Sequence, residues 1–163
     1  MMDKEISNVV RVRFSDCDPI GHLNNVKYLE YMLNAREDHV ESGYGFTYEE
    51  YTKKTGCTWI TIQNEIAYLK EVRYNSKVII SSKTIELSDR LSKVEILMKS
   101  EDGKTIHSIL WLSIIYFNMK TRKSAVHPEE TKELFQKFLM ELEEKDFKSR
   151  VALFRKQNKK VNI

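Results

Sequence analysis

Residues able to do acid–base chemistry are concentrated between positions 13 and 31. Asp16, Asp18 and His22 lie close together in sequence, and Asn24 and Asn25 follow directly. A carboxylate can act as a general base or as a nucleophile, and a histidine can move a proton near neutral pH. The spacing therefore favours a catalytic or binding turn. Turn carboxylates, capping asparagines and a hydrogen-bonded structural histidine are the alternative explanation of the same residues.

The elements predicted on either side of this turn would position those groups. Residues 9–14 mix β-branched and polar side chains, which favours a half-buried strand. Pro19 and Gly21 end the strand pattern with a turn. From Val26, apolar residues recur at helical spacing, and Gly43 is the predicted end of that helix.

The predicted start of the helix bears directly on the chemistry. Asn24 or Asn25 is a suitable N-cap, so Asp18 and His22 would lie beside the first helical turn. Backbone N–H groups in a first turn have no intrahelical acceptor, and the helix dipole is positive there. The pattern therefore suits a reaction that develops negative charge next to a carboxylate.

A family resemblance rests on the same residues. The motif Asp-x-Asp-x-x-Gly-His-x-Asn-Asn-x-x-Tyr-x-x-Tyr runs from Asp16 to Tyr31 and resembles the signature of hotdog-fold thioesterases. It is similar to the 4-hydroxybenzoyl-coenzyme A thioesterase-like branch. The run from His22 to Tyr28 is also close to the fatty acyl-ACP thioesterases. The resemblance extends from about residue 9 to about residue 130 and implies a curved antiparallel sheet wrapped around a long central helix.

The resemblance also implies roles for individual residues. Asp18 matches the catalytic aspartate, and the backbone N–H of Asn25 matches the amide that polarises the thioester carbonyl. His22 matches the catalytic histidine of the acyl-ACP branch, but Ile20 stands where that branch has an asparagine. This departure favours the acyl-coenzyme A branch. The implied substrate-binding set is Gly21, Asn24, Tyr28 and Glu71.

The rest of the chain predicts an α+β fold. Residues 46–54 read as a short helix capped by Thr47 and closed by Gly56. Because four strands then follow without an intervening helix, we expect a mostly antiparallel sheet with the long helix across one face. The strands are expected at 58–68, 77–87, 91–100 and 104–117, the last with a long apolar run at 109–117 near the centre of the sheet. A final helix is predicted from Pro128 to about Lys145.

Length and charge suggest one domain with an appended tail. A chain of 163 residues suits a single core, and we assign residues 1–145 to a hotdog thioesterase domain and 146–163 to a basic C-terminal extension. The extension carries six cations against Asp146, so the net charge of +3 divides into +5 for the tail and −2 for the body. A solvated terminal helix is the preferred interpretation. Attraction to phosphates or acidic carrier proteins is the alternative, and no nucleic-acid module accompanies it.

Several other classes are disfavoured. The N-terminus has no apolar signal segment, and no apolar run is long enough to span a membrane, so we predict a cytoplasmic protein. Cys17 and Cys57 are expected to be reduced thiols. The four histidines are scattered, so neither a metal nor a cofactor is predicted, and Ser15 has no nucleophile-elbow context.

These observations predict an acyl-CoA thioesterase that releases a free acid and CoA. Asp18 would act as general base or nucleophile, and the sequence does not separate the two. The alternatives are an acyl-ACP thioesterase and a non-catalytic acyl-thioester binding module, while a hotdog dehydratase is less favoured. The resemblance further implies a homodimer or homotetramer.

Overall fold

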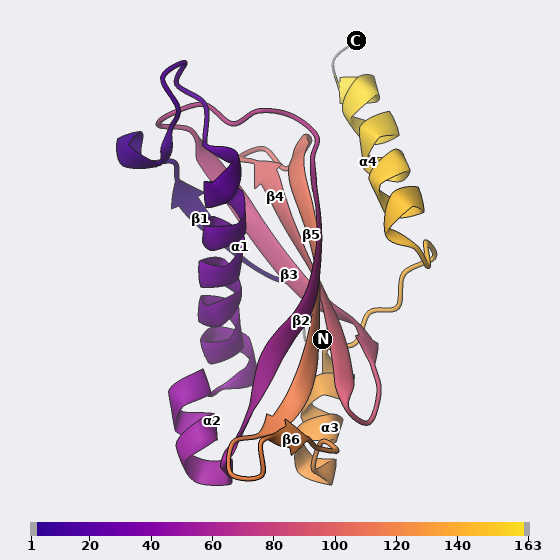
Figure 1. Ribbon diagram of the computed structural model, residues 1–163. Coiled ribbons are helices and arrows are strands. Elements are labelled where there is room, and N and C mark those ends of the chain that lie inside the picture. The colour runs from indigo at the N-terminus through magenta and orange to yellow at the C-terminus, as the bar shows by residue number, and fades with distance from the viewer. Residues whose placement is uncertain (1–2, 162–163) are drawn as a thin grey trace.

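The computed structural model describes residues 3–161 and consists of a curved antiparallel sheet with one long helix across a face (Figure 1). The elements in chain order are β1 (Ile6–Arg11), a 3-10 turn (Phe14–Asp16), α1 (Asn25–His39), a π-helical turn (Val40–Tyr44), α2 (Tyr48–Thr55), β2 (Cys57–Tyr68), β3 (Lys77–Leu87), β4 (Leu91–Ser100), β5 (Ile106–Asn118), β6 (Lys123–Ser124), α3 (Glu129–Lys137) and α4 (Phe147–Val161).

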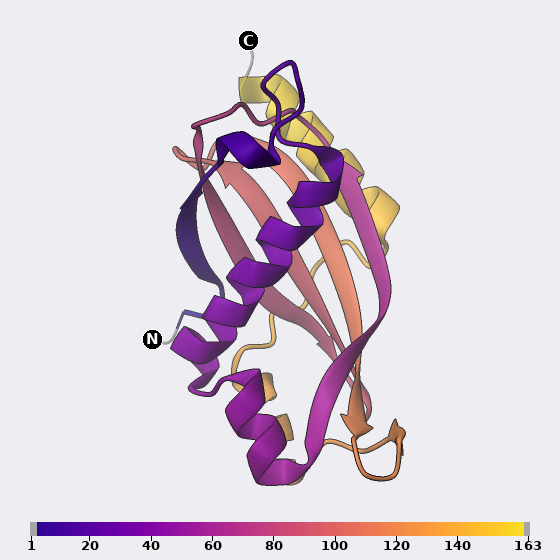
Figure 2. The same ribbon diagram turned by 60° about the vertical axis from the view of Figure 1, so that its left-hand side comes forward.

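The sheet has the antiparallel order that the sequence predicts. Within residues 3–161 its strands run β1-β3-β4-β5-β2, and the short β6 pairs with β5. Figure 2 shows α1 crossing one face of this sheet, which confirms the α+β arrangement. The apolar strand predicted near the centre is β5, an interior strand between β4 and β2.

The strand predicted at residues 9–14 is shifted toward the N-terminus. β1 pairs with β3 from Ile6 to Arg11, whereas Phe14–Asp16 form the 3-10 turn. Val12 is fully buried, but Phe14 is 78% exposed. The prediction of a strand through residue 14 is therefore wrong at its C-terminal end, because the chain leaves the sheet after Arg11 to form the loop that carries Asp18.

The central helix begins as predicted and ends later. Asn24 occupies the N-cap position with an extended backbone, although its side chain makes no capping bond to any described residue. The predicted stop at Gly43 is wrong, because the helix continues as a π-helical turn to Gly45, where φ is +85°. Gly43 is needed for space instead, since a Cβ atom there would collide with the side chain of Ile6.

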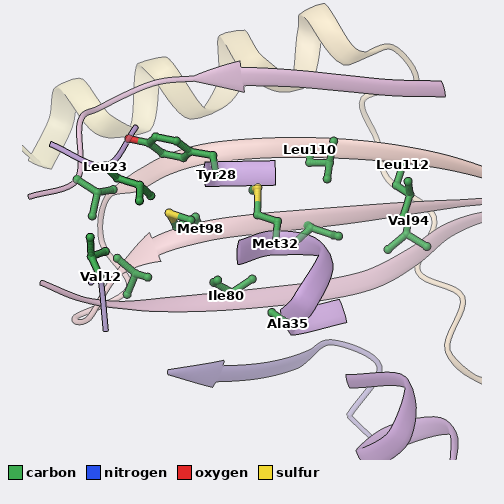
Figure 3. Packing of buried hydrophobic residues seen from close by; sticks show 13 residues of the cluster. Val12, Leu23, Tyr28, Met32, Ala35, Ile80, Val94, Met98, Leu110 and Leu112 are labelled. Carbon is green, nitrogen blue, oxygen red and sulfur yellow. The ribbon is translucent and has the colours of Figure 1, made fainter. Parts of the chain in front are cut away.

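One face of α1 packs into the main hydrophobic core. Tyr28, Met32 and Ala35 are buried against residues of the sheet such as Ile80 and Leu110 (Figure 3). Because buried apolar surface stabilises a fold by roughly 25 cal/mol per Å², this face fixes the position of α1 over the sheet. The N-terminal turn of α1 is thereby held at one end of the sheet, next to the loop that follows β1.

The helix predicted from Pro128 to about Lys145 is shorter than expected. α3 ends at Lys137 because the next residues pair with β3. Leu139 forms a parallel bridge with Thr84, and the backbone N–H of Met140 donates to the carbonyl of Thr84 at 2.8 Å. This contact lies where the pairing of β3 with β4 changes register, so the chain joins the sheet and the helix cannot continue.

The C-terminal tail is a helix, but it is not solvated on all sides. α4 packs on the opposite face of the sheet from α1 (Figure 2). Phe154 is buried against residues of β4 and β5, and Asn158 exchanges hydrogen bonds with both backbone groups of Ile106. Arg150 forms two 2.8 Å bonds to the buried carboxylate of Glu95. The interpretation of the tail as a solvated helix is therefore wrong, since its apolar and ion-pairing residues anchor it to the sheet.

Candidate active site

A tight turn holds Asp18 by its own backbone. One carboxylate oxygen of Asp18 accepts hydrogen bonds from the backbone N–H groups of Ile20 and His22, both at 3.0 Å. The backbone N–H of Asp18 donates to the carbonyl of His22 at 2.8 Å. Gly21 has φ of +83°, a conformation that favours glycine. The second carboxylate oxygen of Asp18, Oδ2, has no hydrogen-bond partner among residues 3–161.

Five of the seven predicted site residues line one cleft of about 290 Å³ beside this turn. They come from the turn, the first turn of α1 and the loop after β2. The five are Asp18, His22, Asn25, Tyr28 and Glu71. Gly21 and Asn24 do not line the cleft. Gly21 shapes the turn, and Asn24 is the N-cap of α1, with its N–H bonded to the carbonyl of Asp16 at 2.9 Å.

The first turn of α1 forms one side of the cleft. Asn25 is the first helical residue, so its backbone N–H has no acceptor within the helix. Its carbonyl accepts a hydrogen bond from the hydroxyl of Tyr68 at 3.2 Å. The rings of Tyr28 and Tyr68 meet edge to face with centroids 5.1 Å apart. The cleft is therefore lined by a carboxylate, by the positive end of a helix dipole and by two aromatic rings.

The other carboxylate of the motif is engaged elsewhere. Asp16 accepts a 2.5 Å hydrogen bond from the hydroxyl of Tyr31 and lies 3.6 Å from the ammonium of Lys27. Burial and the hydrogen bond to Asp16 raise the pKa of Tyr31 to about 12, so its hydroxyl remains a donor. The same hydroxyl accepts from the backbone N–H of Arg13 at 3.1 Å. Asp16 thus ties the turn to α1 and does not line the cleft.

Cys17 lies between the two aspartates but is not an activated thiol. Burial, followed by the carboxylates of Asp18 and Asp16, raises the pKa of Cys17. Its thiol donates to the carbonyl of Arg13 at 3.4 Å. Because the thiolate is the reactive form of cysteine, this environment disfavours Cys17 as a nucleophile.

His39 and His107 lie outside the cleft. His39 is buried between Ser82 and Asn8, with both ring nitrogens 2.7 Å from their oxygens, and burial lowers its pKa to about 4. His107 contacts the carbonyl of Lys70. Among residues 3–161, no group of three or more His, Cys, Asp or Glu side chains is placed to hold a metal ion.

Leu23, Leu69 and Lys70 also line the cleft and were not predicted as site residues. Lys70 lies beside Glu71 in the loop after β2 and contributes to the lining. Its only signal is its position next to Glu71, because a single lysine in a polar loop is more often solvated. Tyr68 ends β2, and its hydrogen bond to the carbonyl of Asn25 joins residues that are far apart in the sequence.

An antiparallel sheet around a central helix, with a turn carboxylate beside the helix N-terminus, defines a hotdog-type protein. Residues 12–135 match the model of the thioesterase-like superfamily, and the chain belongs to that superfamily. This confirms the resemblance seen in the motif. No curated protein matches the chain in sequence.

Solved structures agree with this assignment at the level of the fold. A hypothetical protein from Staphylococcus aureus in complex with CoA superposes with a TM-score of 0.73 at 17% identity, covering 96% of this chain and 87% of its own. A DHNA-CoA thioesterase from Staphylococcus aureus gives 0.72 at 20% identity, with 82% and 89% covered. A 12:0-ACP thioesterase from Umbellularia californica gives 0.73 at 14% identity, with 85% and 52% covered.

Proposed function

We propose that this protein is an acyl-CoA thioesterase that hydrolyses acyl-CoA to a free acid and CoA. Membership of the thioesterase-like superfamily supports thioester hydrolysis. The observation that carries the proposal is the shared cleft, which is lined by both Asp18 and the first turn of α1. A reaction that forms an oxyanion needs both groups in one place.

In the proposed mechanism, the thioester carbonyl lies against the first turn of α1. The backbone N–H of Asn25 donates to the carbonyl oxygen and stabilises the negative charge that develops there. With Asp18 as general base, its carboxylate takes a proton from water while the water oxygen attacks the carbonyl carbon. The C–S bond then breaks, and the thiolate of CoA leaves and takes up a proton. His22 lines the same cleft and is proposed to deliver that proton.

With Asp18 as nucleophile, its free oxygen attacks the carbonyl carbon and forms a mixed anhydride as CoA leaves. Water then hydrolyses the anhydride and regenerates the carboxylate. The two routes use the same residues. Single-turnover hydrolysis in ¹⁸O-labelled water tests for the anhydride, because ¹⁸O enters Asp18 only when water attacks the carboxyl carbon of Asp18 in that intermediate.

We prefer CoA over acyl carrier protein as the carrier. Ile20 replaces the asparagine of the acyl-ACP branch, and its side chain is 75% exposed and outside the cleft. The fold itself does not distinguish CoA from acyl carrier protein as the carrier, since both a protein in complex with CoA and an acyl-ACP thioesterase superpose on the chain. Matched acyl-CoA and acyl-ACP substrates compare the two carriers directly. Substrate binding without turnover would support the binding-module alternative.

We further propose a homodimer or homotetramer. None of the helices within residues 3–161 has the length and apolar character required to cross a bilayer. β2 is an edge strand in the described chain, and its Ile60 and Ile62 are 39% and 54% exposed. Exposed apolar edge strands are sites of pairing with another chain. A cytoplasmic location remains a prediction from the sequence.

The experiment that tests the activity is a panel of short, medium, long and aromatic acyl-CoA substrates, followed by release of free thiol. We expect wild type to hydrolyse some members, and Asp18→Asn to lose at least about 100-fold in kcat because a general base or nucleophile is removed. Asp16→Asn is the matched control, since Asp16 lies two residues away and outside the cleft. Full turnover by Asp18→Asn would exclude Asp18 from the chemistry.

A further inference from the structure

A stripe of residues along α1 and the π-helical turn that follows it leads away from the candidate active site. Val26, Leu29, Leu33, Arg36 and Val40 recur at intervals of three and four residues and therefore share one side of the helix. Val26 is 72% exposed, Leu29 and Leu33 are half-buried, and Arg36 and Val40 are 4% and 2% exposed. The stripe thus descends from the first turn of α1 into the interior. Arg36 is its single charged member.

Arg36 borders a second cavity, of about 360 Å³, between α1 and the sheet. Most of its lining is apolar, including Leu33, Val40, Trp59, Leu112 and Phe135. Figure 3 shows Leu112 and Val94, which also line this cavity, further along the same face of the sheet than Tyr28 of the candidate active site.

The charge of Arg36 is not neutralised by an acidic partner in the described part of the chain. Its guanidinium donates to the hydroxyls of Ser82 and Tyr44, at 2.9 and 3.1 Å, and lies 5.0 Å from the ring centroid of Tyr44. A guanidinium has five N–H donors, and these two partners are neutral. Glu37 lines the same cavity but is exposed and forms no ion pair with Arg36 at 4.0 Å or less. A buried cation without a counterion is unfavourable, so an anion in this cavity would be stabilised.

We propose that this cavity receives the far end of an acyl chain bearing a terminal carboxylate, and that Arg36 pairs with that carboxylate. The proposal rests on the thioesterase function proposed above and deepens it by naming a substrate class, ω-carboxyacyl thioesters. An apolar cavity accommodates the methylene chain, while a planar guanidinium at its border is suited to a carboxylate.

The helix sets the length of chain that would fit. Asn25 and Arg36 are separated by about 16 Å along α1 at about 1.5 Å per residue. A helical side chain leans toward the N-terminus, so the distance to the guanidinium is about 10–16 Å. An extended chain advances about 1.2 Å per bond. An acyl group of about eight to twelve carbons would therefore reach Arg36 from the thioester carbonyl.

The test compares ten-carbon acyl-CoA substrates that end in a carboxylate or in a methyl group. We expect wild type to favour the ω-carboxyl substrate by at least about tenfold in kcat/KM, because a charge-assisted pair forms in a buried place. Arg36→Met, which keeps a long apolar stem, should reverse this preference, and Arg36→Lys should retain part of it. Arg155→Met removes an exposed cation on α4 and should leave the ratio unchanged. Equal turnover of the two substrates by wild type would overturn the proposal.

A binding measurement on the wild-type protein tests the proposal even if the Arg36 variants do not fold or no substrate is hydrolysed. Non-hydrolysable CoA thioethers with the same two chain ends can be titrated into wild-type protein, using tryptophan fluorescence as the readout, because Trp59 lines the cavity. Tighter binding of the ω-carboxyl thioether would support the Arg36 site even if no acyl-CoA were hydrolysed. Equal binding of both thioethers would overturn it whatever the activity on other substrates.

Discussion

Asp16 and Asp18 are two residues apart in the turn before α1, yet their oxygens have different partners. Asp16 is bonded to Tyr31 and lies near Lys27, so it joins the turn to the helix. Asp18 is held through one oxygen by the backbone of its own turn and lines the cleft. The neighbours of each carboxylate, and not its residue type, therefore determine which one is available to a substrate.

The backbone N–H of Asn25 can be removed with little effect on the helix. Proline is well tolerated at the first helical position, where the N–H has no intrahelical acceptor. The preceding residue, Asn24, already has φ of −66° and ψ of 137°, which suits a residue before proline. We therefore expect Asn25→Pro to fold normally and to lose about 100-fold or more in kcat, as when one oxyanion donor is removed.

Asn25→Ala is the control for this change, because it alters the side chain and retains the N–H. Steady-state kinetics of both variants, with thermal unfolding to compare their stabilities, separates the backbone donor from the side chain. If Asn25→Pro were stable and as active as Asn25→Ala, the N–H would have no part in the reaction.

At the scale of elements, α4 is attached to the sheet by a buried ion pair. Arg150 donates twice to Glu95, which also accepts from the indole N–H of Trp111 at 2.9 Å and lies 3.6 Å from Lys83. Removing one member of a buried pair leaves the other charge poorly compensated. We expect Arg150→Met to lower the free energy of unfolding by about 3 kcal/mol in urea titrations.

Two further variants test whether the loss comes from the pair. Arg155→Met lies in the same helix at an exposed position and should change stability by less than about 0.5 kcal/mol. Adding Glu95→Gln to Arg150→Met should cost less than the sum of the single changes, because the uncompensated charge is then absent. Additive losses would mean that Arg150 and Glu95 do not stabilise the fold as a pair.

The end of α3 and the docking of α4 show where prediction from the sequence fails. Helical spacing and turn residues were sufficient for the start of α1, for α2 and for the strands from β2 to β5, since those patterns are local. The end of α3 depends on a bridge between Leu139 and Thr84, which are far apart in the chain. The docking of α4 depends on Glu95, a charged residue in a strand that gives no local sign of being buried. Such long-range contacts cannot be read from periodicity.

At the scale of the whole molecule, the fold brings Glu71 to the cleft from a loop distant in sequence from Asp18. The motif predicted the residues near Asp18 because they are adjacent in the chain. Glu71 was placed only through the resemblance, and Lys70 was missed, since their proximity results from the pairing of the turn with residues 72–74. The backbone of Leu23 donates to Val72, and His22 bridges Arg73.

The exposed edge of β2 bears on both the assembly and the cleft. Tyr68, the last residue of β2, contacts the first turn of α1 and lines the cleft, so pairing of β2 with a second copy would constrain the site.

We expect light scattering to give the mass of a dimer or tetramer. Ile60→Lys combined with Ile62→Lys should shift it toward the monomer, because two side chains that the proposed pairing would bury become charged. Activity should fall with the loss of the oligomer. Val9→Lys, at an exposed apolar residue of β1 on the opposite edge of the sheet, should change neither mass nor activity. A fully active wild-type monomer would show that the site is complete in one chain.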